Sequence, residues 1–424
     1  MKNLSISFLG LNLVKSSPLI VPLRNSQVFL RVSSFNKLFN SAIYCSSHLT
    51  TFRMKNSVFS NFLSSSIKIE EVKIENLTYN QRQVYDDQYG DIEIVTCSFF
   101  GCSSTNYGGG AVYIFFSYVN LYIFSTTFGN CNSLLNGGSV RVSVNNASLS
   151  NICIYNSHCG KGYQCNGIDS TCSDYGVNVV NRSYFMKCSS KKHKFGSSSA
   201  RLSLGYVFVE QTNITDEYSE FDGSLRIIHP YRCRFTRVNV QHINSKITMK
   251  IESNNDFIIS YSNFAQCTAY YTLSFIGDGF VFQNCVWYFN NGELIYERNV
   301  TARFFGCSFD IAERDVLFYT SATFPECQYL VFHPQTYQIV DISIPECENH
   351  RQQIIDIDIN LLDRIVLIIT YVVLGIFSCV SFIYQFKFKK YVPEPKSSRF
   401  EKQLRLSLPL SEDVENPLRT TLIV

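Results

Sequence analysis

Residues 97–115 read CSFFGCSSTNYGGGAVYIF, and residues 126–144 repeat the pattern as TTFGNCNSLLNGGSVRVSV. In both stretches a Phe-x-x-Cys step, Phe99 with Cys102 and Phe128 with Cys131, precedes a pair of glycines. The two phenylalanines are 29 positions apart, and the first glycines of the two pairs are 28 apart. Landmarks that recur at one period in this range are typical of a solenoid, in which each unit buries its apolar face against its neighbours.

The same step recurs along the chain. Further copies are Phe185 with Cys188, Phe264 with Cys267, Phe282 with Cys285, Phe304 with Cys307 and Phe324 with Cys327, with Ile344 and Cys347 as a variant and Phe59 and Phe62 as a degenerate early copy. The segments between the steps are short and rich in Val, Ile, Phe, Tyr and Thr, which favour strands. The pattern therefore predicts a parallel β-helix with one coil for about every 20–29 residues.

Two structural details follow from this prediction. Stacked coils lie about 4.8 Å apart, the ordinary spacing between strands, so the Phe and Ile side chains of neighbouring coils are expected to stack inside the tube. The paired glycines, at 109–110 and 137–138, are expected at a tight corner that requires a positive φ or a close backbone approach.

The glycine motif also carries a resemblance. GGAV at 109–112, paired with a Phe-x-x-Cys step, resembles the repeats of polymorphic membrane proteins, a family of some intracellular bacteria with similar repeats on surface proteins of parasitic protists. GGSV at 137–140 matches with one change, and Cys stands where the step of that family has Asn. The resemblance covers residues 30–350 as a pattern. It implies an all-β fold, a right-handed parallel β-helix like the pectate-lyase solenoid, displayed at a cell surface as an adhesin.

The net charge of the chain comes from one end. The formal net charge of the 424 residues is +3, and residues 387–424, with 8 Lys/Arg and 5 Asp/Glu, account for all of it. The remainder is neutral, which gives no reason to propose nucleic acid as a partner.

The 16 cysteines suggest an oxidising compartment. Four of them, Cys153, Cys159, Cys165 and Cys172, lie in a glycine-rich segment without the Cys-x-x-Cys pairs of a zinc site, so we predict that disulfides staple a Cys-rich loop at 153–172. Cysteines in register on neighbouring coils are also within the disulfide range, which makes Cys102 with Cys131 and Cys307 with Cys327 candidate bridges. A ladder of buried, unbonded thiols is the alternative at these positions.

Sequons agree with passage through the secretory pathway. Candidate N-glycosylation sites are Asn3, Asn76, Asn146, Asn181, Asn213 and Asn299, each followed by x-Ser/Thr. Residues 1–27 have two interpretations, a weak signal peptide or the first coil of the solenoid. The β-helix ectodomain is expected over residues 28–350.

A membrane anchor is predicted near the carboxyl end. Residues 365–384 are 20 uncharged, mostly apolar residues, long enough to cross the lipid bilayer as one transmembrane α-helix. Lys387, Lys389 and Lys390 follow at once, so the positive-inside rule places the tail in the cytoplasm and the solenoid outside the plasma membrane. Residues 351–364 are the juxtamembrane segment. The polar tail, 385–424, is expected to be disordered, and its apolar-x-apolar end fits capture by a cytoplasmic peptide-binding partner.

These observations favour a single-pass surface protein for adhesion or ligand binding, with an extracellular protein or glycan as its partner. The alternative is a membrane-anchored carbohydrate-active enzyme, a polysaccharide lyase or glycoside hydrolase, on the same scaffold. Such an enzyme needs carboxylates that converge in a groove. The nearest acidic groupings are Asp216 with Glu217, Glu220 with Asp222, and Asp310 with Glu313, and none recurs at the coil period. We therefore assign no catalytic, cofactor or metal-binding residues and predict no enzyme. A structural coat protein has the same sequence signature.

Overall fold

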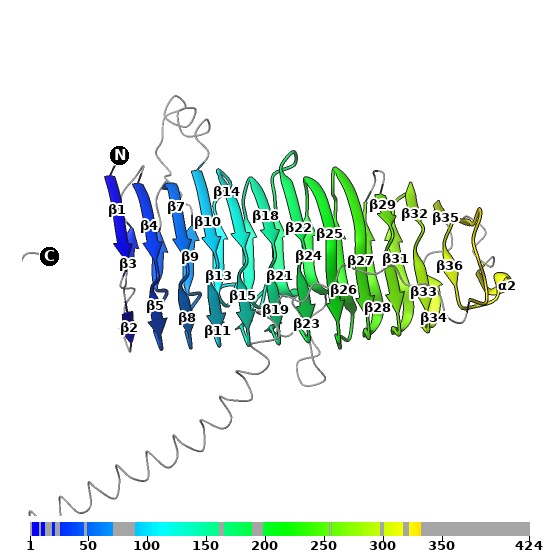
Figure 1. The fold of residues 1–424 in the computed structure, drawn as a ribbon, viewed down its shortest axis with the longest axis horizontal. Coiled ribbons are helices and arrows are strands. Elements are labelled where there is room, and N and C mark those ends of the chain that lie inside the picture. The colour runs from blue at the N-terminus through cyan, green and yellow to red at the C-terminus, as the bar shows by residue number, and fades with distance from the viewer. Residues whose placement is uncertain are drawn as a thin grey trace, which may run out of the picture. The chain divides into compact units, whose positions relative to one another are not determined.

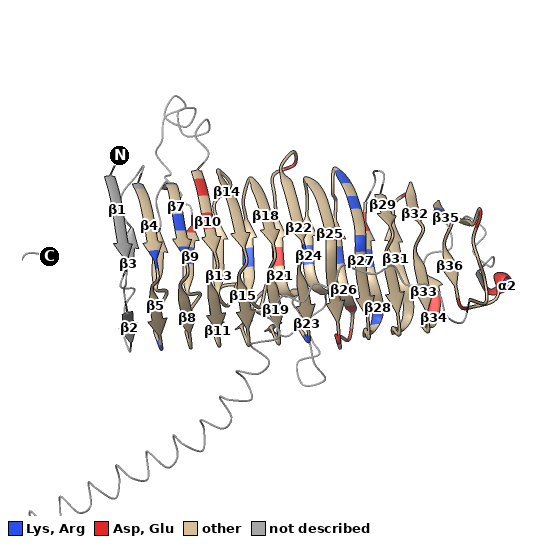
Figure 2. Ribbon diagram, in the orientation of Figure 1, with Lys and Arg blue, Asp and Glu red and all other residues tan. Residues whose placement is uncertain are grey.

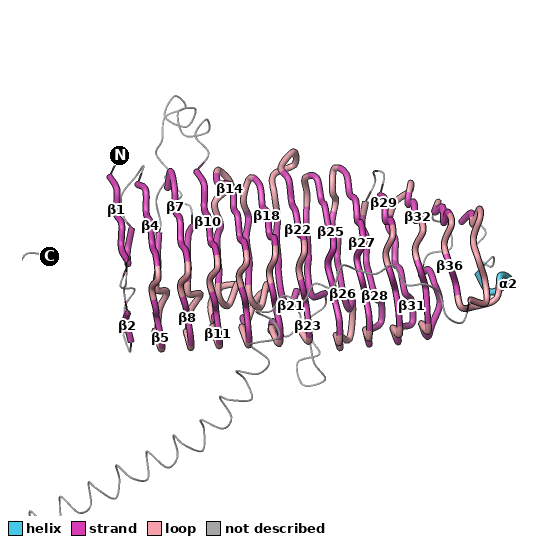
Figure 3. Tube along the Cα trace, in the orientation of Figure 1, coloured by secondary structure: helices cyan, strands magenta, loops and turns pink. Residues whose placement is uncertain are grey.

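A parallel β-solenoid accounts for nearly all of the structure (Figure 1). The computed structural model describes residues 2–7, 10–12, 19–21, 26–45, 49–70, 90–160, 165–188, 198–253, 255, 257–296, 301–316 and 322–331. Within these ranges the only helix is α2 (Glu313–Val316), and every other element is a strand (Figure 3). The predicted all-β parallel solenoid is confirmed. Its right-handed winding stays a prediction, favoured by the chirality of parallel crossover connections.

One coil shows how the sequence becomes the fold. The coil that starts at residue 90 contains β10 (Gly90–Val95), β11 (Ser98–Phe100), β12 (Ser103–Ser104) and β13 (Val112–Phe115), and β14 (Val119–Phe124) opens the next coil. Side chains point alternately into and out of the tube, so that buried and half-buried residues alternate along the whole of β10. β10, β11 and β13 each pair in parallel with the equivalent strands of the coils before and after, whereas β12, among the described residues, pairs only with its equivalent in the coil after it.

The stacked strands form three sheets. The 23-stranded sheet contains the first and second strands of the coils, the 11-stranded sheet contains the last strands, and a 3-stranded sheet lies between them. First strands are β1 (Lys2–Ser7), β4 (Ser26–Arg31), β7 (Leu49–Lys55), β10, β14, β18 (Asn146–Ser150), β22 (Val177–Asn181), β25 (Tyr206–Thr215), β27 (Arg232–Gln241), β29 (Phe257–Ser260), β32 (Phe280–Gln283), β35 (Ala302–Phe305) and β37 (Ala322–Thr323). Second strands are β2 (Gly10–Asn12), β5 (Ser34–Asn36), β8 (Val58–Ser60), β11, β15 (Thr127–Gly129), β19 (Cys153–Tyr155), β23 (Tyr184–Met186), β30 (Asn263–Ala265), β33 (Val286–Tyr288) and β36 (Ser308–Phe309).

The remaining strands complete the tube. The 11-stranded sheet contains β3 (Leu19–Val21), β6 (Ile43–Cys45), β9 (Ile67–Glu70), β13, β17 (Val140–Ser143), β21 (Cys165–Thr171), β24 (Ser198–Ser203), β26 (Asp222–Ile228), β28 (Asn244–Glu252), β31 (Thr268–Ile276) and β34 (Asn291–Ile295). The 3-stranded sheet contains β12, β16 (Asn132–Ser133) and β20 (His158–Cys159). β1, β2 and β3 pair with β4, β5 and β6, so these three strands stack on the solenoid as the strands of a further coil.

Left-handed residues turn the chain at two corners of each coil. Thr96 (φ 53°) separates β10 from β11, and Gly101 (φ 58°) follows β11. The same two places have positive φ in the coils on either side, for example at Asn56, Asn61 and Asn130. The amide of each such residue still donates to the next coil, as Thr96 N does to Phe124 O at 2.9 Å. The corners therefore bend the chain without interrupting the ladder of hydrogen bonds.

A small polar side chain closes the first corner. Cys97 Sγ donates to Val95 O at 3.3 Å, Thr126 Oγ1 to Phe124 O at 3.0 Å, and Ser262 Oγ to Ser260 O at 3.0 Å. Each donor is buried and reaches back two residues across the left-handed turn. Ser, Thr and Cys can all make this contact because each has a donor on Cβ.

Phenylalanine rings stack through the second corner of the early coils. Phe35, Phe59, Phe99 and Phe128 occupy equivalent positions, with ring centroids 4.9, 4.8 and 5.0 Å apart and planes within 15° of parallel. All four are fully buried. The predicted internal stacking is confirmed, and the rings repeat at the spacing of the strands that carry them.

The Phe-x-x-Cys step marks two places in a coil rather than one. Phe264 lies at a second corner, in register with Val240 and Trp287, whereas Phe282 lies at a first corner, in register with Ile259 and Phe304. The steps at 264 and 282 therefore lie in successive coils but at different corners, which is why they are only 18 residues apart. Our assumption that each step marks the same place in its coil is wrong there. Both corners require the same chemistry, an apolar inward residue three positions before a small buried one, so the sequence pattern is the same.

The predicted membrane segments lie outside the described residues. This applies to the juxtamembrane segment 351–364, the transmembrane helix 365–384 and the tail 385–424. In the part of the chain that the structure describes, no helix has the length and hydropathy needed to cross a bilayer.

We expect Phe99→Ala to lower the free energy of unfolding by about 3–5 kcal/mol, because it opens a cavity in the middle of the stack. Urea unfolding of the purified chain, followed by circular dichroism, measures this loss. Phe124→Ala is the matched control, because Phe124 is 45% exposed on the next coil and its truncation is expected to cost less than about 1 kcal/mol. Equal losses for the two variants would contradict a stabilising stack.

Candidate functional site

The outward face of the 11-stranded sheet carries a column of polar and aromatic side chains. Eight successive coils contribute one residue each at the same register: Tyr44, Lys68, Tyr113, Arg141, Asp169, Arg201, Arg226 and Lys250. We call this set the polar column. Charged residues also lie on strands of the 23-stranded sheet, such as β7, β10 and β27 (Figure 2), so the polar column is defined by its shared register rather than by charge alone.

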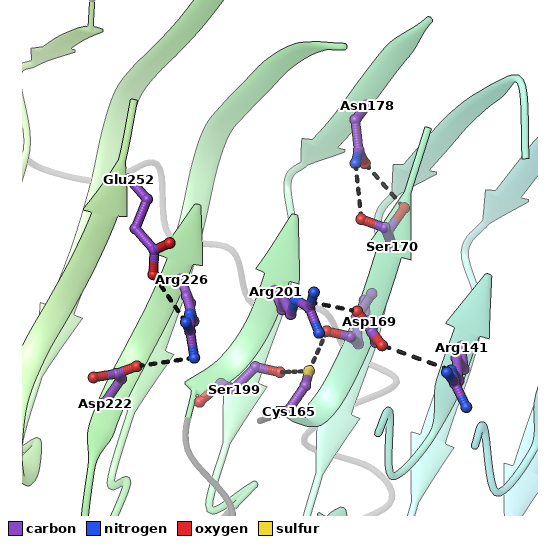
Figure 4. A network of polar contacts seen from close by, with 11 residues as sticks. Arg141, Cys165, Asp169, Ser170, Asn178, Ser199, Arg201, Asp222, Arg226 and Glu252 are labelled. Atoms are coloured by element: carbon purple, nitrogen blue, oxygen red, sulfur yellow. Dashed lines mark hydrogen bonds and ion pairs between the residues drawn. The ribbon is translucent and has the colours of Figure 1, made fainter. Parts of the chain in front are cut away.

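Ion pairs connect the later part of the polar column (Figure 4). Asp169 lies 3.7 Å from Arg141 and 3.8 Å from Arg201, measured from carboxylate oxygen to guanidinium Nε. Arg226 contacts Glu252 at 2.8 Å and Asp222 at 3.8 Å, both from its terminal nitrogens. These contacts match each buried charge with a partner of opposite sign.

Burial and pairing shift the pKa values of the carboxyl groups in opposite directions. Burial raises the pKa of Asp169 and of Asp222, although neighbouring arginines act to lower it. The pKa of Glu252 is lowered, because hydrogen bonds from Lys250 and Arg226 outweigh the effect of its partial burial. The network is therefore a nearly compensated set of charges rather than a strongly basic or acidic surface.

A groove lies at the earlier part of the polar column. Its volume is about 380 Å³, and three neighbouring coils line it with Phe39, Asn40, Ser41, Tyr44, Leu63, Ser64, Lys68, Thr105, Asn106 and Tyr107. We call it the Lys68 groove. Phe39 and Leu63 are about half exposed, at 50% and 53%, so apolar side chains lie beside its polar lining.

Lys68 forms the floor of this groove. Its Nζ lies 2.9 Å from Glu70 Oε1, and the same oxygen accepts a hydrogen bond of 2.9 Å from Tyr44 Oη. The cation also lies 3.7 Å from the centre of the Tyr107 ring and 5.2 Å from that of Tyr44. Burial acts to lower the pKa of Lys68, but hydrogen bonds to Glu70 and Tyr107 outweigh it and raise the pKa. The ammonium group therefore stays charged and holds both tyrosines in place.

The glycine motif directly follows residues 105–107, the loop residues that form one wall of the Lys68 groove. Gly109 has φ +68°, and a Cβ there would lie 2.0 Å from Val112 O, while a Cβ on Gly110 would lie 2.3 Å from Gly138 O. Ser65 Oγ donates to Gly109 O at 2.6 Å and fixes the turn on the preceding coil. The predicted tight corner is confirmed, and this corner brings Tyr107 over Lys68.

Acidic residues do not converge on the groove as an acid–base pair. Glu217 is buried and accepts a hydrogen bond from Cys188 N at 3.0 Å. Asp310 accepts a hydrogen bond from Phe289 N, and Asp222 belongs to the ion-pair network. Among the described residues no group of three or more His, Cys, Asp or Glu is placed to hold a metal ion.

The cysteines are part of the scaffold. The described residues of the segment 153–172, which are 153–160 and 165–172, contain β19, β20 and β21, where the glycines predict a loop, and the four cysteines are buried. Thiols are free at Cys102, Cys131, Cys159, Cys165, Cys172, Cys307 and Cys327. At these seven positions the structure therefore has the thiol ladder and not the bridges, since Cys102, Cys131, Cys307 and Cys327 each donate to the carbonyl two residues earlier. Cys153 stays a disulfide candidate.

Three sequons can be placed on the fold. Asn146, Asn181 and Asn213 are half-buried on the outer face of the 23-stranded sheet, in β18, β22 and β25. The Asn146 amide donates to Asn120 Oδ1 at 2.7 Å, and its own oxygen accepts from Val177 N at 2.7 Å. Asn76 and Asn299 lie outside the described residues, as does the side chain of Asn3.

The fold and the column define the class of the protein, a parallel β-solenoid with a grooved, polar outer face. No protein-family model, curated protein or solved structure matches the chain. The resemblance to polymorphic membrane proteins therefore stays a prediction.

Two glycine substitutions separate the need for a positive φ from the need for space. Gly101→Asn is expected to leave the free energy of unfolding within about 0.5 kcal/mol of the wild type, because Asn tolerates this conformation. Asn61 and Asn130 already adopt it at the equivalent corners, with φ of 59° and 53°. Gly109→Asn is expected to cost about 2 kcal/mol or more, because its Cβ has no room. Urea unfolding measures both, and equal costs would refute the close-approach argument.

Because thiols of the solenoid are buried, we expect the free energy of unfolding to fall at alkaline pH. Burial raises the pKa of Cys97, Cys172 and Cys267 to about 12 from an ordinary value of 9.0. Above pH 9 the unfolded chain therefore releases these protons while the folded chain retains them, so the free energy of unfolding falls as pH rises, by up to about 1.4 kcal/mol per pH unit for each thiol. Unfolding in reductant at pH 8 and pH 10 measures the slope. Cys97→Ser, which keeps the corner donor, is expected to reduce it, and a stability independent of pH would contradict free, buried thiols.

Proposed function

We propose that this chain is a non-enzymatic surface protein that binds an extracellular ligand in the Lys68 groove. In this proposal the solenoid is displayed outside the cell, and residues 365–384 anchor it in the plasma membrane. The observation that carries the proposal is the groove itself, in which two tyrosines and a paired lysine meet on the outward face of three coils.

Preorganisation supports a binding role. Tyr44 and Lys68 project from β6 and β9, which hydrogen-bonded ladders fix on both sides. Tyr107 is fixed by Lys68 and by a hydrogen bond of 3.1 Å from its own amide to Ser104 Oγ. A site held in this way loses little conformational entropy on binding.

Carboxylate geometry favours binding over the alternative of a carbohydrate-active enzyme. Glycoside hydrolysis uses two carboxyl groups on either side of the scissile bond. The carboxylate next to the Lys68 groove, Glu70, already accepts hydrogen bonds from Lys68 and Tyr44. Asp222 and Glu252 share Arg226 as a partner and belong to the compensated network. These carboxylates are already paired with side chains of the scaffold.

The placed sequons are compatible with an accessible groove. All three lie on the 23-stranded sheet, whereas Tyr44, Lys68 and the rest of the polar column lie on the 11-stranded sheet. Because the Asn146 amide is used within the scaffold, we expect Asn181 to be a better glycan acceptor than Asn146.

We expect Tyr107→Ala to reduce adhesion of cells that express the full chain by about tenfold, because it removes a wall of the groove. The measurement is adhesion to immobilised laminin, fibronectin, collagen and mucin. Phe124→Ala is the control for an exposed aromatic residue on the other sheet, and it is expected to leave adhesion unchanged. Equal adhesion by wild type and Tyr107→Ala would contradict a role for the groove.

Display outside the cell has a separate test on the same cells. Removal of N-glycans is expected to increase the electrophoretic mobility of the chain, and Asn181→Gln is expected to remove part of that shift. An unchanged mobility, together with thiols that react only after the plasma membrane is permeabilised and the chain is denatured, would place the solenoid in the cytosol and contradict the proposal.

A further inference from the structure

We infer that the Lys68 groove takes an uncharged oligosaccharide, with one or two sugar rings seated in the groove. This inference rests on the proposed function and specifies its ligand. Three properties of the groove support it, namely its size, the chemistry of its lining and its balance of charge.

The size of the groove fits a small ring better than a protein surface. Its volume of about 380 Å³ lies within the range of about 300–1,000 Å³ that is usual for small-molecule sites. A stable protein partner, in contrast, needs roughly 1,200–2,000 Å² of buried surface. A groove of this size can hold only a limited part of such a partner.

The lining matches the hydroxyl groups of a sugar. Six of the ten lining residues are Asn, Ser, Thr or Lys. Amide and hydroxyl groups act as both donors and acceptors, as sugar hydroxyls do, so they can form reciprocal pairs. An apolar ligand would instead remove water from the exposed Thr105 and Asn106 side chains without replacing their hydrogen bonds, which costs about 1–3 kcal/mol for each group left unpaired.

Aromatic rings provide the second element of sugar recognition. Tyr44 and Tyr107 contribute flat surfaces, and Phe39 adds a half-exposed ring at the edge of the groove. A pyranose presents one face of C–H groups, which packs on such rings while its hydroxyls stay at the polar lining. Lys68 lies 3.7 Å from the centre of the Tyr107 ring, and the Tyr113 ring packs beside it with centroids 5.3 Å apart. The Tyr107 ring is therefore held in place before the ligand arrives.

Charge balance selects an uncharged sugar. The positive charge of Lys68 is matched by Glu70 at 2.9 Å, and Tyr44 hydrogen-bonds to the same carboxylate. An acidic sugar would have to compete with Glu70 for Lys68 and would bring two negative charges together. A basic ligand would meet the opposite difficulty at Lys68. The groove therefore favours ligands without a formal charge.

The test uses the purified full-length chain in detergent on an array of immobilised oligosaccharides. Uncharged glycans ending in glucose, galactose, mannose or N-acetylglucosamine are compared with sialylated, uronate-containing and sulfated ones. Binding is expected on one group of uncharged glycans and is expected to change little with salt, because no net charge is neutralised. Binding to acidic glycans alone, or binding that is lost as salt increases, would overturn the inference.

Groove variants connect this binding to the site. Tyr107→Ala and Asn106→Ala are expected to weaken glycan binding about tenfold, and Phe124→Ala is expected to leave it unchanged. Asn106 is exposed on the loop, so its truncation leaves the solenoid core intact even if Tyr107→Ala alters the loop. Full binding by both groove variants would show that the sugar binds elsewhere and would refute the inference.

One further comparison separates failure of the inference from failure of the proposed function. Periodate, which cleaves the vicinal diols of sugars, is applied to the adhesive surface before the cells are added. Adhesion that needs Tyr107 and is lost after periodate supports both proposals. Adhesion that needs Tyr107 but survives periodate overturns the sugar and retains a groove that binds protein. Adhesion that does not need Tyr107 overturns both.

Discussion

The structure depends on hydrogen bonds between coils at corner residues whose left-handed backbone conformation is unfavourable in an isolated chain. In the described part of the chain, 23 non-glycine residues have positive φ. Six of them are Asn, which tolerates this conformation, and most of the others cost about 1–2 kcal/mol each, or tens of kcal/mol in total. An amide–carbonyl bond to the next coil contributes roughly 0.5–1.5 kcal/mol, so each corner is stable only when a neighbour is stacked on it. A single coil therefore cannot hold its own shape, and the fold exists only as an array.

The same corners account for much of the unusual composition. An inward residue at a corner has to be small, buried and able to reach a carbonyl two positions back, and Cys fits as well as Ser or Thr. Cys97, Cys285 and Cys307 close first corners, whereas Cys102 and Cys131 close second corners. A high cysteine count usually indicates disulfides in a secreted chain, but here it reflects a geometric requirement that thiols satisfy without bonding to one another.

Sequence reasoning predicted the features that repeat and missed those that depend on register. The period, the Phe stack and the tight glycine corner follow from local pattern, because every coil requires the same residues. The two corners share one motif, so counting steps could not show that Phe264 and Phe282 lie at different corners of successive coils. The Lys68 groove was missed for another reason. Tyr107 and Lys68 are far apart in the sequence and meet because β9 pairs with β13, a register that the local sequence pattern does not reveal. The available signal was the outward position of Tyr44, Lys68 and Tyr113 in three successive last strands, which becomes visible once those strands are aligned.

The groove also shows where a solenoid of this kind has freedom to acquire a function. The first and second corners are constrained by backbone hydrogen bonds and by buried donors, so a change there affects every neighbouring coil. The loop that leads into the 11-stranded sheet is constrained less, and residues 105–107 can present Thr, Asn and Tyr because Gly109 and Gly110 absorb the tight turn behind them. The site is nevertheless built from three coils, since Lys68 belongs to one, Tyr44 to the coil before it and Tyr107 to the coil after it. A ligand in the groove therefore bridges coils that already depend on one another, so binding and stacking stabilise the same arrangement.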